Sequence, residues 1–138
     1  MLACLKESGA EAITVAIRRV DLKNQDNSDI LRVLNPEKIF IIPNTSGATN
    51  HKEAVRTASF AREMGLSNWV KLEVTPDPRY LLPDPDETLK AANILVKEGF
   101  VVLPYINADP VLAKKLEDVG CAAVMPLAAP IGTNKGLT

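Results

Sequence analysis

The sequence predicts an α/β fold, a partial (β/α)8 TIM barrel of about five parallel strands with crossover helices between them. Five short runs of apolar and β-branched residues have the length of strands. They cover residues 12–17, 38–42, 69–74, 100–103 and 122–125. The centres of successive runs lie 27, 30, 31 and 23 residues apart, which is the length of one strand, one helix and two loops. Aromatic residues make up only 4% of the chain, and the abundant aliphatic residues suit helices packed on a parallel sheet.

The segments around these runs carry helix signals. Residues 1–8 have the pattern of a helix end closed by Gly9, and residues 30–34 predict a short helix in an otherwise irregular connection. The next three connections each combine an N-cap side chain with a glycine suited to the helix C-terminus. These pairs are Asn50 and Gly65, Asp84 and Gly99, and Asp109 and Gly120. Glu53, three residues after the first of these caps, completes the pattern of a capping box.

The motifs that are absent favour a barrel. A doubly wound nucleotide-binding sheet should carry a glycine-rich loop after its first strand, yet neither G-x-G-x-x-G nor G-x-x-x-x-G-K-[ST] occurs. A closed barrel needs about 200–250 residues, whereas this chain has 138. We therefore expect residues 1–138 to form a single truncated barrel domain that lacks units at both ends.

Composition and charge exclude several classes of function. With 16 basic and 17 acidic side chains the net charge is −1, so the chain lacks the positive field that nucleic-acid binders need. No apolar run is long enough to span a bilayer, and Met1 does not open a signal peptide. We expect a cytoplasmic protein without a membrane partner. Cys4 and Cys121 lack the spacing of a metal or redox pair and are expected to stay reduced.

The third run is the most informative segment for chemistry. Side chains alternate along a strand, so Lys71 and Glu73 share one face while Val70, Leu72 and Val74 share the other. Both faces of a parallel strand are usually covered, and two ionisable groups there must be paired or used. One interpretation is a Schiff base at Lys71 with Glu73 as general acid and base. The alternatives are a purely structural ion pair, or an edge strand with one wet face.

Further polar residues follow the ends of other runs, where α/β barrels place their active sites. Arg18 shares a face with Thr14 and is well placed to hold an anion, Asn44 follows the second run, and Tyr105 follows the fourth. Each could equally be a solvated loop residue.

Two weaker signals lie elsewhere. Gly132 and Gly136 follow the fifth run and allow a tight loop whose amides could approach a phosphate, although a plain surface turn explains them as well. His51 is the only histidine and has no ligand-spaced neighbours, so we expect an exposed loop residue and no metal site.

Seven segments, spread over nearly the whole chain, form a pattern more specific than any single motif. They are residues 18–21, 42–47, 68–74, 81–85, 87–92, 99–105 and 120–127. In order and spacing they resemble the bacterial thiazole synthase family of thiamine biosynthesis. The resemblance implies a (β/α)8 barrel of which this chain holds strands two to six and lacks strand one and strands seven and eight.

The resemblance also implies an activity. The family condenses 1-deoxy-D-xylulose 5-phosphate, dehydroglycine and the thiocarboxylate of a small sulfur-carrier protein into a thiazole phosphate. Carried over by position, Lys71 forms the imine with the sugar phosphate, and Glu73 transfers protons. Gly132, in the sequence A-P-I-G, contacts the phosphate, and Ala128 departs from the family's usual glycine. The implied partners are the carrier protein and, for a full-length chain, further copies of itself; we expect no metal and no cofactor.

Two other functions fit the same residues. A Schiff-base aldolase acting on a sugar phosphate would use the same lysine but would need no sulfur donor. An inactive truncated piece would keep only part of a surface that meets the carrier or sister subunits. Under the main interpretation, we expect catalysis from a full-length protein and none from the isolated 138 residues.

Overall fold

The computed structural model describes residues 2–19, 34 and 39–136. The helix predicted at residues 30–34 therefore lies outside the described residues, apart from Leu34, which is buried. Lys38, the first residue of the second predicted strand, lies outside them as well.

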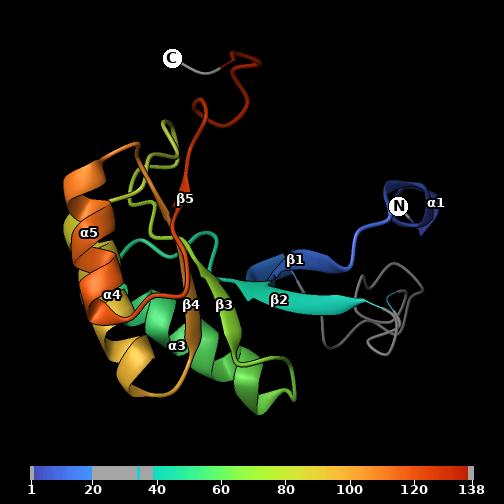
Figure 1. Cartoon of the computed structure of the whole chain (residues 1–138), viewed down its shortest axis with the longest axis horizontal. Helices are drawn as coiled ribbons and strands as arrows, with labels where there is room; N and C mark the ends of the chain where they lie inside the picture. Colours follow the sequence, from blue (N-terminus) through green and yellow to red (C-terminus); the bar gives the residue numbers. More distant parts are fainter. Residues whose placement is uncertain (1, 20–33, 35–38, 137–138) are drawn as a thin grey trace.

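Five parallel strands follow one another in the sheet order β1-β2-β3-β4-β5. Their bounds are β1 Ala12–Ala16, β2 Phe40–Asn44, β3 Trp69–Leu72, β4 Val101–Ile106 and β5 Met125–Pro126. Figure 1 shows that the sheet curls, with β1 and β2 turned away from the direction of β3 and β4. The predicted fold class, a partial α/β barrel, is confirmed.

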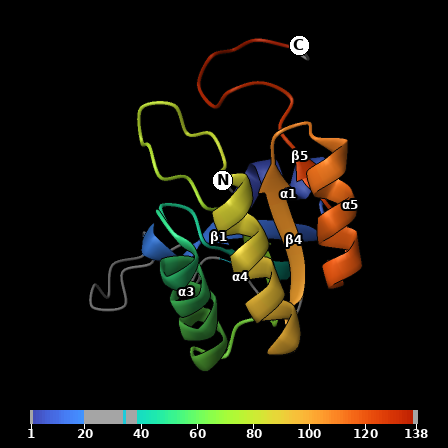
Figure 2. The same ribbon diagram turned by 90° about the vertical axis from the view of Figure 1, so that its left-hand side faces the viewer.

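The bounds of the helices are α1 Leu2–Ser8, the 3₁₀ turn η1 Ile17–Arg19, α3 His51–Glu63, α4 Pro85–Lys97 and α5 Pro110–Val119. The helix α1 precedes β1, the turn η1 follows β1, and α3, α4 and α5 connect β2 to β3, β3 to β4 and β4 to β5. Figures 1 and 2 show α3, α4 and α5 side by side on one side of the sheet, as the outer layer of a barrel would lie. No described helix is both long enough and apolar enough to cross a membrane.

The three predicted helix starts and stops are confirmed. Each N-cap side chain accepts backbone N–H groups of the first turn: Asn50 from Glu53, Asp84 from Glu87, and Asp109 from Val111 and Leu112. At the other ends, Gly65, Gly99 and Gly120 have φ of +82°, +81° and +102°, a conformation that glycine adopts without a steric penalty.

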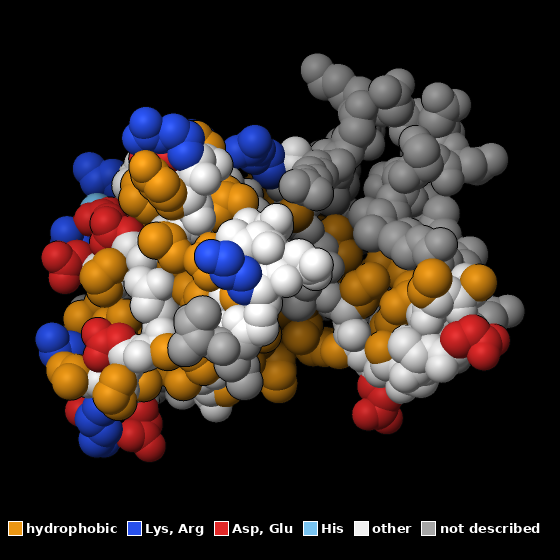
Figure 3. Space-filling view, turned by 90° about the horizontal axis from the view of Figure 1, so that it is seen from above, with side chains coloured by type: hydrophobic (Ala, Val, Ile, Leu, Met, Phe, Trp, Pro, Cys, Tyr) orange, Lys and Arg blue, Asp and Glu red, His pale blue; other side chains and the backbone are white. Residues whose placement is uncertain are grey.

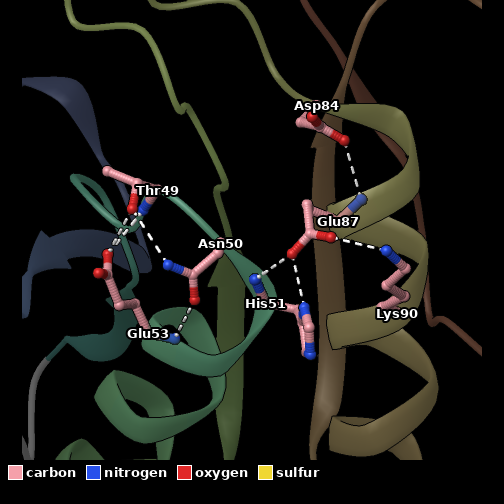
Figure 4. Close-up of polar contacts among 7 residues, drawn as sticks. All are labelled: Thr49, Asn50, His51, Glu53, Asp84, Glu87 and Lys90. Carbon is pink, nitrogen blue, oxygen red and sulfur yellow. Dashed lines mark hydrogen bonds and ion pairs between the residues drawn. The ribbon is translucent and has the colours of Figure 1, made fainter.

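The capping box at α3 differs from the predicted form. The Glu53 carboxylate accepts from the N–H and the hydroxyl of Thr49, at 2.8 and 3.0 Å, instead of from the N–H of Asn50 (Figure 4). The reciprocal bond has therefore moved one residue toward the N-terminus, because the Thr49 hydroxyl adds a second donor there.

Alternation along β3 separates the core from the opposite face, as predicted. Val70, Leu72 and Val74 are fully buried and pack with the apolar sides of α3, α4 and α5. Lys71 and Glu73 lie on the other face of the strand. The sheet therefore has a dry outer side under the helices and a concave inner side that carries ionisable groups.

The observed ends of β3, β4 and β5 differ from the ends of the predicted strands, because hydrogen bonds of the backbone decide where each strand stops. The strand β3 stops at Leu72 because Val74 and Thr75 bond to loops: Thr75 N donates to Ala48 O, and Val74 O accepts from Asp84 N. The strand β4 continues to Ile106 because it pairs there with Met125 and Pro126, which also confines β5 to those two residues. The strand predicted at residues 122–125 therefore lies too far toward the N-terminus, since the observed strand is Met125–Pro126.

Candidate active site

The centre of the candidate site is the ion pair on the inner face of β3. Lys71 Nζ lies 3.3 Å from Glu73 Oε1, and the two side chains are 23% and 10% exposed. A largely buried ion pair is stable only when further hydrogen bonds satisfy its charges. The neighbouring strand β2 provides them.

Asn44, the last residue of β2, holds the Glu73 side chain. It pairs in register with Lys71, and its Nδ2 donates to Glu73 Oε1 at 2.7 Å. Its Oδ1 accepts from Ser46 N at 2.5 Å, which fixes the orientation of the amide. The predicted site residues Asn44, Lys71 and Glu73 therefore lie together, and Asn44 contacts the carboxylate directly.

Thr45 fixes the backbone of Glu73 from the same side. Its hydroxyl donates to Glu73 O and accepts from Glu73 N, each at 2.8 Å. Glu73 is thus held at both its backbone and its carboxylate, so the position of this group is set before any ligand binds. Nothing in the order of residues along the chain predicts this bond, because Thr45 follows β2 and Glu73 follows β3, 28 residues later.

Tyr105 completes the inner face on β4. Leu103, two residues earlier, lies opposite Lys71 in the sheet, and the centroid of the Tyr105 ring is 5.8 Å from Lys71 Nζ. Burial and, to a smaller extent, the negative charge of Glu73 raise the pKa of the phenol. Sequence reasoning placed Tyr105 at a strand end without giving it a role, and the ring's contact with Lys71 becomes evident only from the pairing of β3 with β4.

Arg18 lies beside this cluster and does not contact it. The strand β1 ends at Ala16, and the chain winds into η1, where the Arg18 side chain is exposed. Its guanidinium rests against Gly47, since a Cβ built on that glycine would lie 2.3 Å from Arg18 Nη1. Arg18 and Ser46 line one cavity of about 390 Å³. Ser46 and Glu73 line another cavity of about 350 Å³, so Ser46 borders both cavities.

The loop after β5 reaches the site through Ile131. This side chain lines the same cavity as Thr14, Asn44 and Glu73. Gly132, the next residue, has φ of +79°, is exposed, and leaves open space where a Cβ would stand. The predicted phosphate-contacting glycine therefore lies next to a residue of the cavity wall, with its backbone accessible.

His51 is not the exposed loop residue that the sequence predicts. It is the first residue of α3 and is half-buried, and both its N–H and its Nδ1 approach Glu87 Oε2, at 2.8 and 2.5 Å (Figure 4). Glu87 also accepts from Lys90 Nζ at 2.7 Å. The bond from the His51 N–H, followed by those from Lys90 and the imidazole, lowers the pKa of Glu87 to about 2. This contact ties the start of α3 to α4.

The described residues contain no cluster of three or more His, Cys, Asp or Glu side chains arranged to hold a metal ion.

Cys121 is partly buried, and burial raises the pKa of its thiol to about 11, which makes it a poor nucleophile. The chemistry available at the site is therefore that of one amine, one carboxylate and one phenol.

Comparisons with known proteins agree on one family. The family model described as thiazole biosynthesis protein ThiG matches residues 1–138. A thiazole synthase from Syntrophobacter fumaroxidans is 61% identical over 137 residues, and one from Cytophaga hutchinsonii is 62% identical over the same length. Each match covers 99% of this chain and 53% of the relative, so the chain spans about half the length of the curated relatives it matches.

A solved structure is similar over the same region. The crystal structure of the Amycolatopsis orientalis BexX/CysO complex contains a chain that superposes with a TM-score of 0.81 at 32% sequence identity. The match covers 97% of this chain and 55% of that chain.

Proposed function

Because this chain belongs to the ThiG family of thiazole biosynthesis proteins, we propose that it carries the imine-forming part of a thiazole synthase active site. The substrates are 1-deoxy-D-xylulose 5-phosphate, dehydroglycine and a sulfur-carrier thiocarboxylate. One observation carries the proposal: Lys71 presents its amine on the inner face of the barrel strand, 3.3 Å from the carboxylate of Glu73. A lysine amine beside a group able to take up and return a proton is the arrangement that Schiff-base chemistry requires.

The first covalent step uses Lys71. Its neutral amine attacks the ketone carbon of the sugar phosphate, a C=N bond forms, and the carbonyl oxygen leaves as water. Glu73 accepts the proton that the amine gives up and returns a proton to the departing oxygen. Asn44 keeps the carboxylate in place throughout, because its Nδ2 already donates to Glu73 Oε1.

Gly132 and Arg18 are proposed to contact the phosphate of the substrate. The backbone of Gly132 is accessible beside Ile131, which lines the cavity that contains Glu73. Arg18 offers a permanent positive charge at the neighbouring cavity. The phosphate of the substrate is on C5, three carbons from the ketone carbon C2, so the residues that contact it need not touch Lys71.

The sulfur donor is proposed to be a small carrier protein with a C-terminal thiocarboxylate. Support comes from the similar solved structure, which is a complex of BexX with CysO. We further propose that the full-length protein is cytoplasmic and assembles with copies of itself. Neither a generic aldolase nor an interaction-only role is favoured, because the family model and the curated relatives all belong to thiazole biosynthesis.

A turnover assay on the full-length reading frame that contains this chain tests the proposal. The protein should form thiazole phosphate only when sugar phosphate, dehydroglycine and carrier thiocarboxylate are all present. Lys71→Arg should abolish product, because a guanidinium keeps the charge but forms no reversible imine. Lys97→Arg, at the exposed end of α4, is the matched control and should form thiazole phosphate at the normal rate. Product from the Lys71→Arg protein, or cleavage of the sugar phosphate without a sulfur donor, would contradict the proposal.

A further inference from the structure

Two buried hydroxyl groups have no hydrogen-bond partner among the described residues. They are the phenol of Tyr105 and the side-chain hydroxyl of Thr88. A buried polar group without a partner destabilises the folded state, so native proteins contain few such groups and each needs a reason.

The two hydroxyls lie on opposite sides of the sheet. Thr88 shares the buried face of α4 with Ala91 and Leu95, against the apolar core. Tyr105 lies on the inner face of β4, with its ring 5.8 Å from the Lys71 amine, and is only 8% exposed. Of the two, only Tyr105 is next to a group that reacts with a ligand.

The phenol is a hydrogen-bond donor that the resting site does not use. Its raised pKa keeps the hydroxyl protonated at neutral pH. The neighbouring carboxylate oxygen, Glu73 Oε1, is already occupied by Asn44 and Lys71. The ring that carries this donor lies beside the Lys71 amine, so an acceptor on a substrate bound at Lys71 could supply the partner that the hydroxyl lacks.

We propose that Tyr105 is a substrate-contacting residue whose hydroxyl donates a hydrogen bond to the hydroxyl oxygen on the carbon next to the imine formed at Lys71. The inference rests on the proposed function, because it takes Lys71 as the imine-forming residue. Imine formation removes the carbonyl oxygen as water, so the acceptor must be a different oxygen of the substrate. The class of ligand selected is therefore an α-hydroxyketone phosphate over a simple ketone phosphate.

The test compares Tyr105→Phe with Thr88→Val in the full-length reading frame. Each change removes one buried hydroxyl and keeps the shape of the side chain. Borohydride converts the imine to a stable secondary amine, and the rate of this trapping is measured with 1-deoxy-D-xylulose 5-phosphate and with its analogue lacking the hydroxyl next to the ketone. The unmodified protein should prefer the hydroxylated compound about five- to tenfold, the effect of one neutral hydrogen bond.

The two variants should then differ. Tyr105→Phe should lose the preference while trapping the simple ketone as well as the unmodified protein does, and Thr88→Val should keep the preference. Neither should lower the thermal melting temperature, because replacing an unpartnered buried hydroxyl by an apolar group of the same shape is neutral or stabilising.

Three results would overturn the inference. If Tyr105→Phe keeps the preference, the hydroxyl does not contact the substrate. If it traps both compounds equally slowly and melts at a lower temperature, Tyr105 has a structural role only. If the unmodified protein forms no adduct on Lys71 with either compound, the proposed function fails and the inference fails with it.

Discussion

At the scale of single residues, hydrogen bonds hold Glu73 at both its backbone and its carboxylate. Asn44 holds its carboxylate, and Thr45 bonds to both its N–H and its carbonyl. Preset geometry of this kind would favour the acid-base role proposed for Glu73, because the carboxylate need not be reordered when substrate binds. It also predicts that the function of Glu73 can be removed without disturbing its surroundings.

Glu73→Gln should slow turnover by about 10²–10⁴-fold, the usual contribution of general acid-base catalysis. Glutamine has the shape of glutamate, and its amide oxygen can still accept from Asn44, so imine trapping on Lys71 should survive. Steady-state assays of thiazole formation measure the first effect, and borohydride trapping measures the second. Glu63→Gln, at the exposed end of α3, is the control. If Glu73→Gln leaves the turnover number unchanged, Glu73 is only a structural partner of Lys71.

The sequence predicts the central pair of the site and misses how the pair is held. Lys71 and Glu73 could be placed on one face because strand alternation is a local rule. The bond from Asn44 to Glu73 and the contact of Tyr105 with Lys71 depend on the register between strands. That register is set by contacts between residues about 30 positions apart in the chain, which local patterns do not report.

At the scale of elements, local sequence patterns predict the ends of the helices more accurately than the ends of the strands. Caps at Asn50, Asp84 and Asp109 stand where the sequence predicts them, because a cap is an interaction over three residues. The end of β4 and the position of β5 were missed, because they are decided by pairing between two strands. The contact between His51 and Glu87 was missed for the same reason, since it joins two helices (Figure 4).

The link between α3 and α4 should make stability depend on pH. The folded-state pKa of Glu87 is about 2, below its ordinary value of 4.5. A depressed carboxyl pKa stabilises the fold above the unfolded value, and this contribution is lost as pH falls from about 4.5 toward 2. Melting temperatures measured from pH 6 to pH 3 should therefore fall less steeply for Glu87→Gln than for the unmodified chain.

The matched control for this pH series is Asp86→Asn, which removes an exposed carboxylate from the same helix turn. Its melting temperatures should fall with pH as steeply as those of the unmodified chain. Equal slopes for Glu87→Gln and the unmodified chain would show that the contact with His51 and Lys90 does not stabilise the fold in solution.

At the scale of the whole molecule, the described sheet has two open edges and an uncovered inner side. Strands β1 and β5 each pair with one neighbour only among the described strands. Phe40 lies on the same face of β2 as Asn44, and Trp69 lies on the same face of β3 as Lys71. The two aromatic side chains are 42% and 37% exposed, and their rings stack edge to face with centroids 5.4 Å apart. Figure 3 likewise shows apolar side chains at the surface, while charged ones gather mostly over the helical side. A closed barrel would bury such an inner side.

A polypeptide of these 138 residues alone should therefore self-associate. Open strand edges pair with other chains, and exposed apolar surface adds to the attraction. Such a polypeptide should also form no thiazole, because water in the open site weakens the electrostatic interactions that guide the reaction. Size-exclusion chromatography with light scattering, over a range of concentrations, measures the first property, and the turnover assay measures the second. A compact, active monomer would show that five strands suffice and that the prediction of a truncated domain is wrong.

Locating the covalent adduct tests most directly whether Lys71 forms the imine with the sugar phosphate. The full-length reading frame is incubated with 1-deoxy-D-xylulose 5-phosphate, reduced with borohydride, digested and mapped by mass spectrometry. We expect one modified peptide, with the added mass of the reduced sugar phosphate on Lys71, and no modification in the Lys71→Arg protein. An adduct on another lysine, such as Lys97 or Lys115, or an adduct that persists in Lys71→Arg, would contradict this expectation.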